Sequence, residues 1–159
     1  MSKPLVVILM GSRADMDHST RISDACRQYG LDTVWRIASA HKTPEHALAI
    51  LREYEGDDRP KVYITVAGRS NALSGFTDGS VSAPVIACPP SSDSFGGADV
   101  FSSLRMPSGI APAVVLEPVN AALLAAKIFG VANAEIREQV RLSQKRAAVK
   151  ILEDDSNVR

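Results

Sequence analysis

The sequence predicts an α/β fold, in which a five-stranded parallel sheet is covered by helices and a long helix ends the chain. Two observations support this prediction. Short apolar runs rich in valine and isoleucine alternate with segments of helical periodicity. Hydrophobic residues make up 45% of the chain and charged residues 23%, as in globular proteins. Aromatic residues make up only 5%, so valine, isoleucine, leucine and alanine are expected to build the core.

The first strand and helix have clear boundaries. Leu5–Met10 is an uninterrupted apolar run that follows Pro4 and precedes Gly11, which is typical of a strand buried on both faces. The next segment has mostly helical spacing of its apolar residues, and Gly30 is expected to end that helix. The apolar positions are Met16, Ile22, Cys26 and Tyr29.

The same alternation continues through the middle of the chain. Thr33–Ala38 is a weaker strand, and Val62–Ala67 is a third strand. The helix between them is expected to begin at Thr43-Pro44-Glu45, with threonine as the cap and proline at the first helical position. Its end is expected at Gly56, and its apolar face is expected to comprise Ala47, Leu48, Leu51 and Tyr54.

The second half contains the remaining two strands. Val85–Cys88 and Ala113–Leu116 are the fourth and fifth apolar runs. Ser70–Ser80 is a short polar helix interrupted by glycine, Val100–Arg105 is one or two helical turns, and Asn120–Phe129 is a strong helix. No repeat or linker interrupts this order, so residues 1–159 are expected to form one domain.

The tail, Ala134–Asp154, is expected to be a long, highly charged helix. Its apolar residues form a narrow stripe, which buries little surface within one subunit. The stripe could pack on a neighbouring subunit or on its own chain, and the pattern favours neither. It consists of Ile136, Val140, Ala147 and Ile151.

Charge and composition exclude several classes of function. Eighteen basic residues balance eighteen acidic ones, which argues against a broad electrostatic surface for nucleic acid or membrane and leaves room for a local anion site. No run reaches the roughly 18 apolar residues of a membrane span, and the N-terminal apolar stretch is too short for a signal peptide. The two cysteines, Cys26 and Cys88, are expected to be buried and reduced, which favours a cytoplasmic protein.

In a parallel α/β sheet, ligands bind beyond the carboxyl ends of the strands. The loop after the first strand begins Gly11-Ser12 and opens a helix, so its free N–H groups and the Ser12 hydroxyl could bind a phosphate. Asp15 suits ribose hydroxyls better than a phosphate. Alternatively, Ser12 or Asp15 simply caps the helix. The loop matches neither Gly-x-x-x-x-Gly-Lys nor Gly-x-Gly-x-x-Gly.

The loop after the second strand, Ser39-Ala40-His41-Lys42-Thr43-Pro44, is the most informative one. His41 can accept or donate a proton near neutral pH, and Lys42 supplies a cation beside it. His41 is therefore a candidate catalytic or ligand-binding residue, although a lone histidine is more often structural.

Two further loops could contribute to the site. Gly68, Arg69, Ser70 and Asn71 follow the third strand and offer donors suited to a carboxylate or CO2 oxygen, unless Ser70 merely caps the next helix. The long loop from Pro89 to Gly97 could close over a ligand or remain a surface loop. The sequence has no Cys/His cluster with metal spacing and no Gly-x-Ser-x-Gly elbow.

Taken together, these motifs resemble the phosphoribosylaminoimidazole carboxylase (PurE) family of purine biosynthesis. The resemblance rests on Gly11-Ser12-x-x-Asp15, the loop Ser39–Pro44, Met106-Pro107-Ser108-Gly109 and the helix from Asn120 to Ala126. It runs from about Pro4 to the end of the chain. It implies a three-layer α/β/α flavodoxin-like fold, a homo-oligomer (tetramer or octamer), a ribonucleotide substrate, and no metal, ATP or biotin.

The resemblance also implies roles for individual residues. His41 is expected to be the proton carrier. The ribose phosphate is expected to bind Ser12, Asp15 and Lys42, with Ser39 nearby. The CO2 or carboxylate group is expected to lie against Gly68, Ser70 and Asn71.

The sequence resembles the less common of the two classes within this family. Lys42 follows His41 where the commoner bacterial class has arginine. The third loop reads Ala67-Gly68-Arg69-Ser70-Asn71-Ala72-Leu73-Ser74-Gly75 where that class has Gly-Gly-Ala-Ala-His-Leu-Pro-Gly. The second class is a carboxy-lyase that carboxylates aminoimidazole ribonucleotide (AIR) directly with CO2, and the commoner class rearranges the N5-carboxy compound. The alternatives are therefore that mutase activity, or a non-catalytic nucleotide- or flavin-binding module on the same fold.

Overall fold

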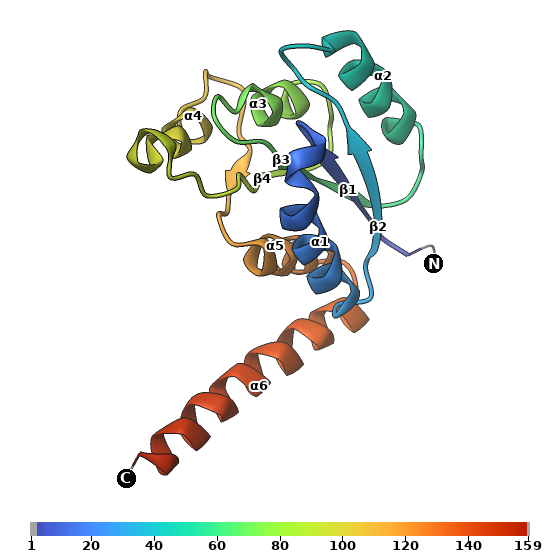
Figure 1. Ribbon diagram of the computed structural model, residues 1–159. Helices are drawn as coiled ribbons and strands as arrows, with labels where there is room; N and C mark the ends of the chain where they lie inside the picture. Colours follow the sequence, from blue (N-terminus) through green and yellow to red (C-terminus); the bar gives the residue numbers. More distant parts are fainter. Residues whose placement is uncertain (1–2, 159) are drawn as a thin grey trace.

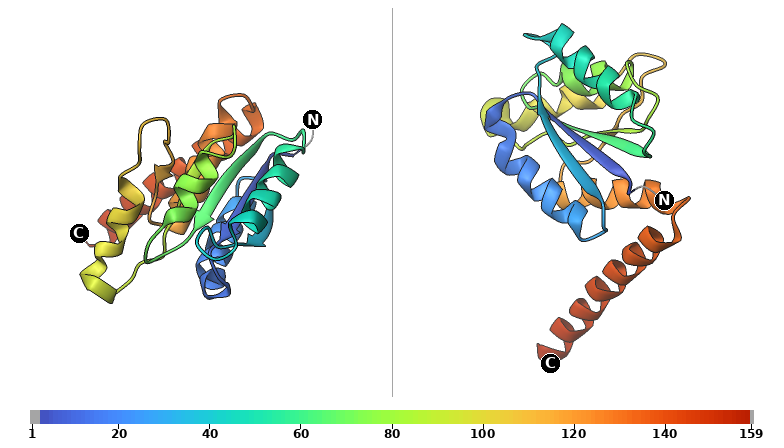
Figure 2. Two further views of the ribbon diagram at one scale, coloured as in Figure 1. Left: turned by 90° about the horizontal axis from the view of Figure 1, so that it is seen from above. Right: turned by 90° about the vertical axis from the view of Figure 1, so that its right-hand side faces the viewer.

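The computed structural model describes residues 3–158, so the first two residues and the last residue of the expected domain lie outside the described part. One parallel sheet forms the centre, and helices cover both of its faces (Figures 1 and 2). The strands are β1 (Leu5–Met10), β2 (Asp32–Ile37), β3 (Lys61–Val66), β4 (Val85–Ala87) and β5 (Ala113–Val114). The α-helices are α1 (Met16–Arg27), α2 (Pro44–Glu55), α3 (Ala72–Asp78), α4 (Phe101–Leu104), α5 (Pro118–Gly130) and α6 (Ala134–Asn157).

The strand order β2-β1-β3-β4-β5 is that of the flavodoxin-like fold and confirms the predicted fold class. β1 lies between β2 and β3 and pairs in parallel with both along its whole length, from Leu5 to Met10. After β1 the chain adds β2 along one edge of β1, and then crosses to add β3 along the opposite edge. The loops that follow β1 and β3 therefore diverge, and this point of the sheet is where such folds bind ligands.

The core consists of two apolar clusters, one on each face of the sheet. Every residue of β1 is buried, which confirms the prediction of a strand covered on both faces. Because strand side chains alternate between faces, Val6, Ile8 and Met10 join the cluster under α1 and α5, whereas Leu5, Val7 and Leu9 join the cluster under α2 and α3. The sheet that carries the site is thus anchored from both sides.

Two local predictions need correction. Thr43 precedes α2 as expected, but its side chain makes no capping hydrogen bond to that helix and binds Ser39 instead. The loop after β4, expected to run from Pro89 to Gly97, contains η2 (Ser94–Val100), in which two short helical turns are joined by a kink. Three consecutive residues in it, Phe95, Gly96 and Gly97, have positive φ, a conformation that the hydrophobic pattern of the sequence does not predict.

Helix α6 extends away from the rest of the molecule (Figure 1). Ile136 and Val140 are buried against the cluster under α1 and α5, so the first two turns pack on their own chain. Further along, the predicted stripe is exposed, and Ile151 is 67% accessible. None of the helices that the structure describes is both long and apolar enough to span a membrane.

Candidate functional site

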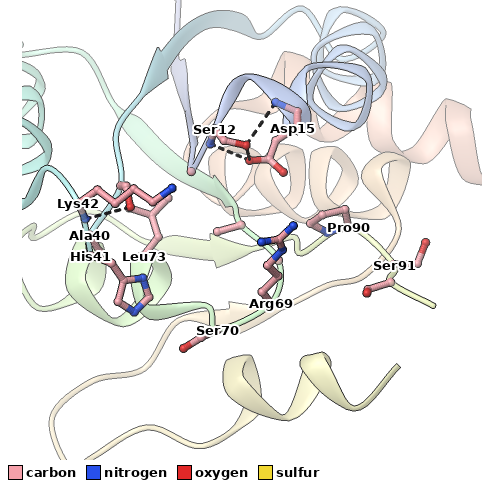
Figure 3. A pocket seen from close by; sticks show the side chains of 16 residues that line it. Ser12, Asp15, Ala40, His41, Lys42, Arg69, Ser70, Leu73, Pro90 and Ser91 are labelled. Atoms are coloured by element: carbon pink, nitrogen blue, oxygen red, sulfur yellow. Dashed lines mark hydrogen bonds between the residues drawn. The ribbon is translucent and has the colours of Figure 1, made fainter. Parts of the chain in front are cut away.

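A cavity of about 770 Å³ lies at the carboxyl ends of β1, β2 and β3 (Figure 3). Four loops line it, and they are the four that follow the first four strands. All of the predicted site residues except Asn71 contribute to its wall, so the structure brings together loops that are far apart in sequence. The predicted residues in the wall are Ser12, Asp15, Ser39, His41, Lys42, Gly68 and Ser70.

The loop after β1 forms a capping box. The Ser12 backbone N–H donates to Oδ2 of Asp15 at 2.9 Å, and the Ser12 hydroxyl accepts from the Ala14 N–H at 3.2 Å. Asp15 and Ser12 therefore cap the short 3₁₀ helix η1 (Arg13–Asp15), the role that the sequence offers as an alternative to ligand binding. Both side chains also face the cavity, so capping orients them toward a ligand and does not remove them from the site.

Gly11 keeps this turn close to the sheet. A Cβ atom at this position would lie 3.3 Å from Cβ of Ala67 and 3.7 Å from Oδ2 of Asp15. The first of these distances is tighter than ordinary side-chain contact. A larger residue would therefore push the Ser12–Asp15 turn away from β3 and change the shape of the cavity.

The loop after β2 is held by hydrogen bonds that leave two side chains unpaired. The Ser39 hydroxyl accepts from the Lys42 N–H at 3.2 Å, and the Thr43 N–H donates to the Ser39 carbonyl at 2.8 Å. This tight turn places His41 and Lys42 at the cavity (Figure 3). Within residues 3–158, neither the His41 ring nor the Lys42 ammonium group makes a hydrogen bond or ion pair, so both are available to a ligand.

The loop after β3 contains an unusual backbone conformation. Arg69 has φ of 60°, which is rare for a residue with a Cβ atom and costs conformational energy. Its guanidinium group lies on the side of the cavity formed by Asp15 and Pro90, away from His41 (Figure 3). From the sequence, Arg69 is one of the donors suited to a carboxylate or CO2 oxygen but not one of the predicted site residues, and spacing alone does not reveal its left-handed conformation.

The structure places Asn71 beneath the cavity wall and not in it. The side chain is buried, with 3% accessibility, and caps α3 by accepting from the Ser74 N–H at 3.2 Å. Its amide group donates to the hydroxyl of Ser103 at 2.9 Å. Asn71, rather than Ser70, is thus the cap of this helix, and Ser70 remains exposed at the cavity.

The loop after β4 adds three wall residues that were not among the predicted site residues, namely Pro90, Ser91 and Ser92. Pro90 also lies close to Gly68, where an added Cβ would be 3.4 Å from Cγ of the proline. The small residue at position 68 thus lets two cavity loops approach each other.

The other histidines have different surroundings. Nε2 of His18 lies 3.4 Å from Sγ of Cys88, outside the cavity. Burial, with help from the nearby Arg21, lowers the pKa of His18, and burial raises the pKa of the Cys88 thiol to about 12. His46 is exposed on α2. In the part of the chain that is described, no three histidine, cysteine or acidic side chains are grouped to hold a metal ion.

Comparison with known proteins identifies the family to which a chain with this cavity belongs. The family model for AIR carboxylase matches residues 5–150. The chain belongs to the AIR carboxylase family. This is the PurE family of purine biosynthesis, so the resemblance predicted from the sequence motifs is confirmed, as is an enzyme of the carboxy-lyase type.

Individual relatives agree with this assignment. The chain is 59% identical to a phosphoribosylaminoimidazole carboxylase of Treponema denticola, covering 99% of both chains, and 55% identical to one of Archaeoglobus fulgidus, covering 96% of this chain and 84% of the relative. It is 43% identical to a bifunctional carboxylase/succinocarboxamide synthetase of Mus musculus, of which it spans 36%. The crystal structure of Treponema denticola PurE superposes with a TM-score of 0.97 at 58% identity, covering 99% of each chain.

Proposed function

We propose that this member of the family carboxylates AIR directly with CO2, in a reversible reaction, to give 4-carboxy-AIR. The observation that carries the proposal is the unpaired His41 imidazole in a cavity whose other polar groups are hydroxyls, backbone groups, the Asp15 carboxylate and two cations. The names of the Treponema and Archaeoglobus relatives support a carboxylase. Lys42 and the Gly68–Asn71 sequence favour direct use of CO2 over rearrangement of the N5-carboxy compound.

The ribose phosphate is proposed to bind near Lys42, Ser39 and the Ser12–Asp15 turn. Asp15 already occupies the N–H of Ser12, so the carboxylate satisfies that donor at the start of η1. Positive charge for the phosphate can come from the two side-chain cations of the cavity, Lys42 and Arg69, both of which are unpaired within the described residues. The free oxygen of Asp15 suits a ribose hydroxyl, which can donate to it.

CO2 is proposed to lie against Gly68 and Ser70. Gly68 allows close approach of the backbone, and the exposed Ser70 hydroxyl can donate to an oxygen that gains negative charge as the C–C bond forms. Asn71, which was expected to contact this group, is instead proposed to support the loop from below, because its side chain is occupied by Ser74 and Ser103.

The proposed chemistry needs position, removal of water and one proton transfer. The amino group of AIR makes its ring enamine-like, so the electron pair at C4 attacks the carbon of CO2 and leaves a carboxylate. C4 then carries both the carboxylate and its original hydrogen. His41 removes that proton, the C–H electrons return to the ring, and aromaticity is restored. In the reverse direction, imidazolium at position 41 protonates C4 before CO2 departs.

Two further features belong to this proposal. We propose that residues 1–159 form one AIR carboxylase domain, since all the described strands belong to one sheet, which helices cover on both faces. We also propose that the chain assembles as a tetramer or octamer, because the exposed apolar residues on α6 need a partner surface.

A single assay tests the reaction. Purified protein is supplied with AIR, bicarbonate and carbonic anhydrase, without ATP, and 4-carboxy-AIR is measured. Product formation is expected. No product from AIR, together with conversion of the N5-carboxy compound, would identify a mutase and overturn direct use of CO2. Neither activity, in a protein that binds flavin, would support a non-catalytic module.

A further inference from the structure

The turn that presents Arg69 is held from outside the cavity by one hydroxyl group on α4. The single hydroxyl hydrogen of Ser102 is shared between two acceptors, the carbonyl oxygen of Asp99 at 2.7 Å and that of Arg69 at 3.1 Å. The same oxygen accepts from the backbone N–H of Asn71 at 2.9 Å. One side chain thus bridges the peptide groups on both sides of Ser70. Ser102 lies 33 positions after Arg69 in the sequence.

These hydrogen bonds contact the strained part of the loop directly. With φ of 60°, Arg69 adopts a conformation that an isolated peptide would rarely occupy, so surrounding contacts have to maintain it. The hydrogen bonds of Ser102 fix the peptide planes that follow Arg69 and precede Asn71. If they were lost, Arg69 could relax toward negative φ, and its side chain would leave the cavity.

The guanidinium that this turn presents has no partner of its own. Among the described residues it forms no hydrogen bond or ion pair, although it is a cavity residue near Asp15 and Pro90 (Figure 3). A guanidinium fork binds phosphate oxygens through paired N–H groups. Asp15 accepts from the Ser12 N–H and Ser12 from the Ala14 N–H, so these two backbone donors are not free for a phosphate. The Arg69 guanidinium can supply donors in their place.

We propose that Arg69 binds the phosphate of the nucleotide substrate and that Ser102 is the positioning residue that aims it. This inference rests on the proposed function for the identity of the nucleotide. Ser102 itself does not touch the substrate. Its effect passes through the backbone of Arg69, and it couples the loop after β3 to α4.

The test compares four variants: Arg69→Ala, Ser102→Ala, Ser102→Thr and the double variant Arg69→Ala/Ser102→Ala. Affinity for AIR is measured by calorimetry without CO2, and KM and kcat are measured in the ATP-free assay. Arg69→Ala is expected to weaken AIR binding roughly 10- to 100-fold, the loss of a charge-assisted interaction. Ser102→Ala is expected to weaken AIR binding roughly 5- to 10-fold, mainly by raising KM. The reason is that a smaller fraction of the protein then holds Arg69 in the orientation that binds the phosphate.

The double variant separates positioning from general structural damage. If Ser102 acts through Arg69, Ser102→Ala adds less than about twofold to Arg69→Ala, because the two residues then form one coupled unit. Ser102→Thr keeps the hydroxyl and is expected to restore binding. Ser80→Ala is the matched control, since the Ser80 hydroxyl also donates to a backbone carbonyl of α3, that of Phe76, but lies away from the cavity. It is expected to leave affinity unchanged.

Several results would overturn the inference. These are full additivity in the double variant, a fall in kcat with unchanged KM, or failure of Ser102→Thr to rescue binding. The phosphate-free riboside of AIR gives a further arm, because Arg69→Ala should not weaken its binding. If wild-type protein binds AIR but forms no product, the proposed function fails alone. If equal losses occur for riboside and nucleotide, the phosphate assignment fails alone.

Discussion

At the scale of single residues, His41 carries the entire proton transfer of the proposed reaction. Its ring is unpaired within the described residues, while the backbone around it is fixed by Ser39 and Thr43. A rigid turn with a free side chain is what a proton carrier requires, since the base has to reach C4 without first breaking another hydrogen bond.

Replacing His41 with asparagine is therefore expected to remove turnover and leave the fold intact. His41→Asn should lower kcat roughly 10²-fold or more, the usual loss for a missing general base. Binding of AIR by calorimetry and the melting temperature should stay close to wild type. His46→Asn, an exposed histidine on α2, is the control and should keep full activity. Near-normal turnover of His41→Asn would exclude the ring from the mechanism.

The residues of this site differ in how far sequence could predict them. His41 and Lys42 could be assigned because they follow a predicted strand, and the carboxyl ends of parallel strands share one edge. Asn71 could not be separated from Ser70, because both are good helix caps and only the packing of Ser103 beneath the loop decides between them. The positive φ of Arg69 could not be predicted either, because the hydroxyl that contacts its carbonyl oxygen, that of Ser102, is distant in sequence.

At the scale of secondary structure, a carboxylate links α2 to the segment before β4. Glu55 accepts hydrogen bonds from the N–H and hydroxyl of Ser82 at 3.0 and 2.9 Å, and from the hydroxyl of Tyr63 at 3.0 Å. Burial by itself would raise the pKa of Glu55, but the hydrogen bonds from Ser82 and Tyr63 outweigh burial and lower it. The ionised form is therefore favoured in the folded protein.

This lowered pKa predicts a pH-dependent contribution to stability. A group with a depressed folded-state pKa stabilises the protein above its unfolded pKa, about 4.5 for this glutamate, and the contribution is lost as pH falls through the folded value. Glu55→Gln should thus reduce the free energy of unfolding by roughly 1–2 kcal/mol at pH 7. The difference from wild type should shrink steadily below about pH 4.5.

Urea unfolding at several pH values and equal protein concentration measures this difference. Glu153→Gln is the control, because Glu153 is exposed on α6, and it should change stability little at any pH. A constant difference between Glu55→Gln and wild type from pH 7 to pH 3 would contradict the assignment.

Sequence patterns predicted most elements of the sheet and its helices, and their failures have a common cause. β1 and β3 could be located because long apolar runs are needed where both faces are covered. β5 comprises only Ala113 and Val114, so the apolar run from Ala113 to Leu116 predicts a longer strand than the structure has. The η2 segment depends on positive φ at Phe95, which no apolar pattern encodes.

At the scale of the whole molecule, α6 has two different halves. Its first turns pack on the chain through Ile136 and Val140, and Oη of Tyr29 lies 3.3 Å from Oγ of Ser143. Beyond that point the helix projects from the rest of the structure (Figure 2). Ile151 and Leu152 are 67% and 70% accessible there. The sequence left open whether the stripe packs on its own chain or on a neighbour, and the first half does the former.

The exposed second half of α6 is therefore where a substitution is expected to weaken self-association. A helix end without tertiary packing is marginally stable in water, and burying two exposed aliphatic side chains against another copy would offset that weakness. Ile151→Glu places a charge in such an interface and should weaken self-association at least roughly tenfold, measured by light scattering across a dilution series. Gln139→Glu, exposed and off the stripe, adds the same charge and should leave assembly unchanged. An unaltered oligomer in Ile151→Glu would show that this half of α6 does not hold the assembly.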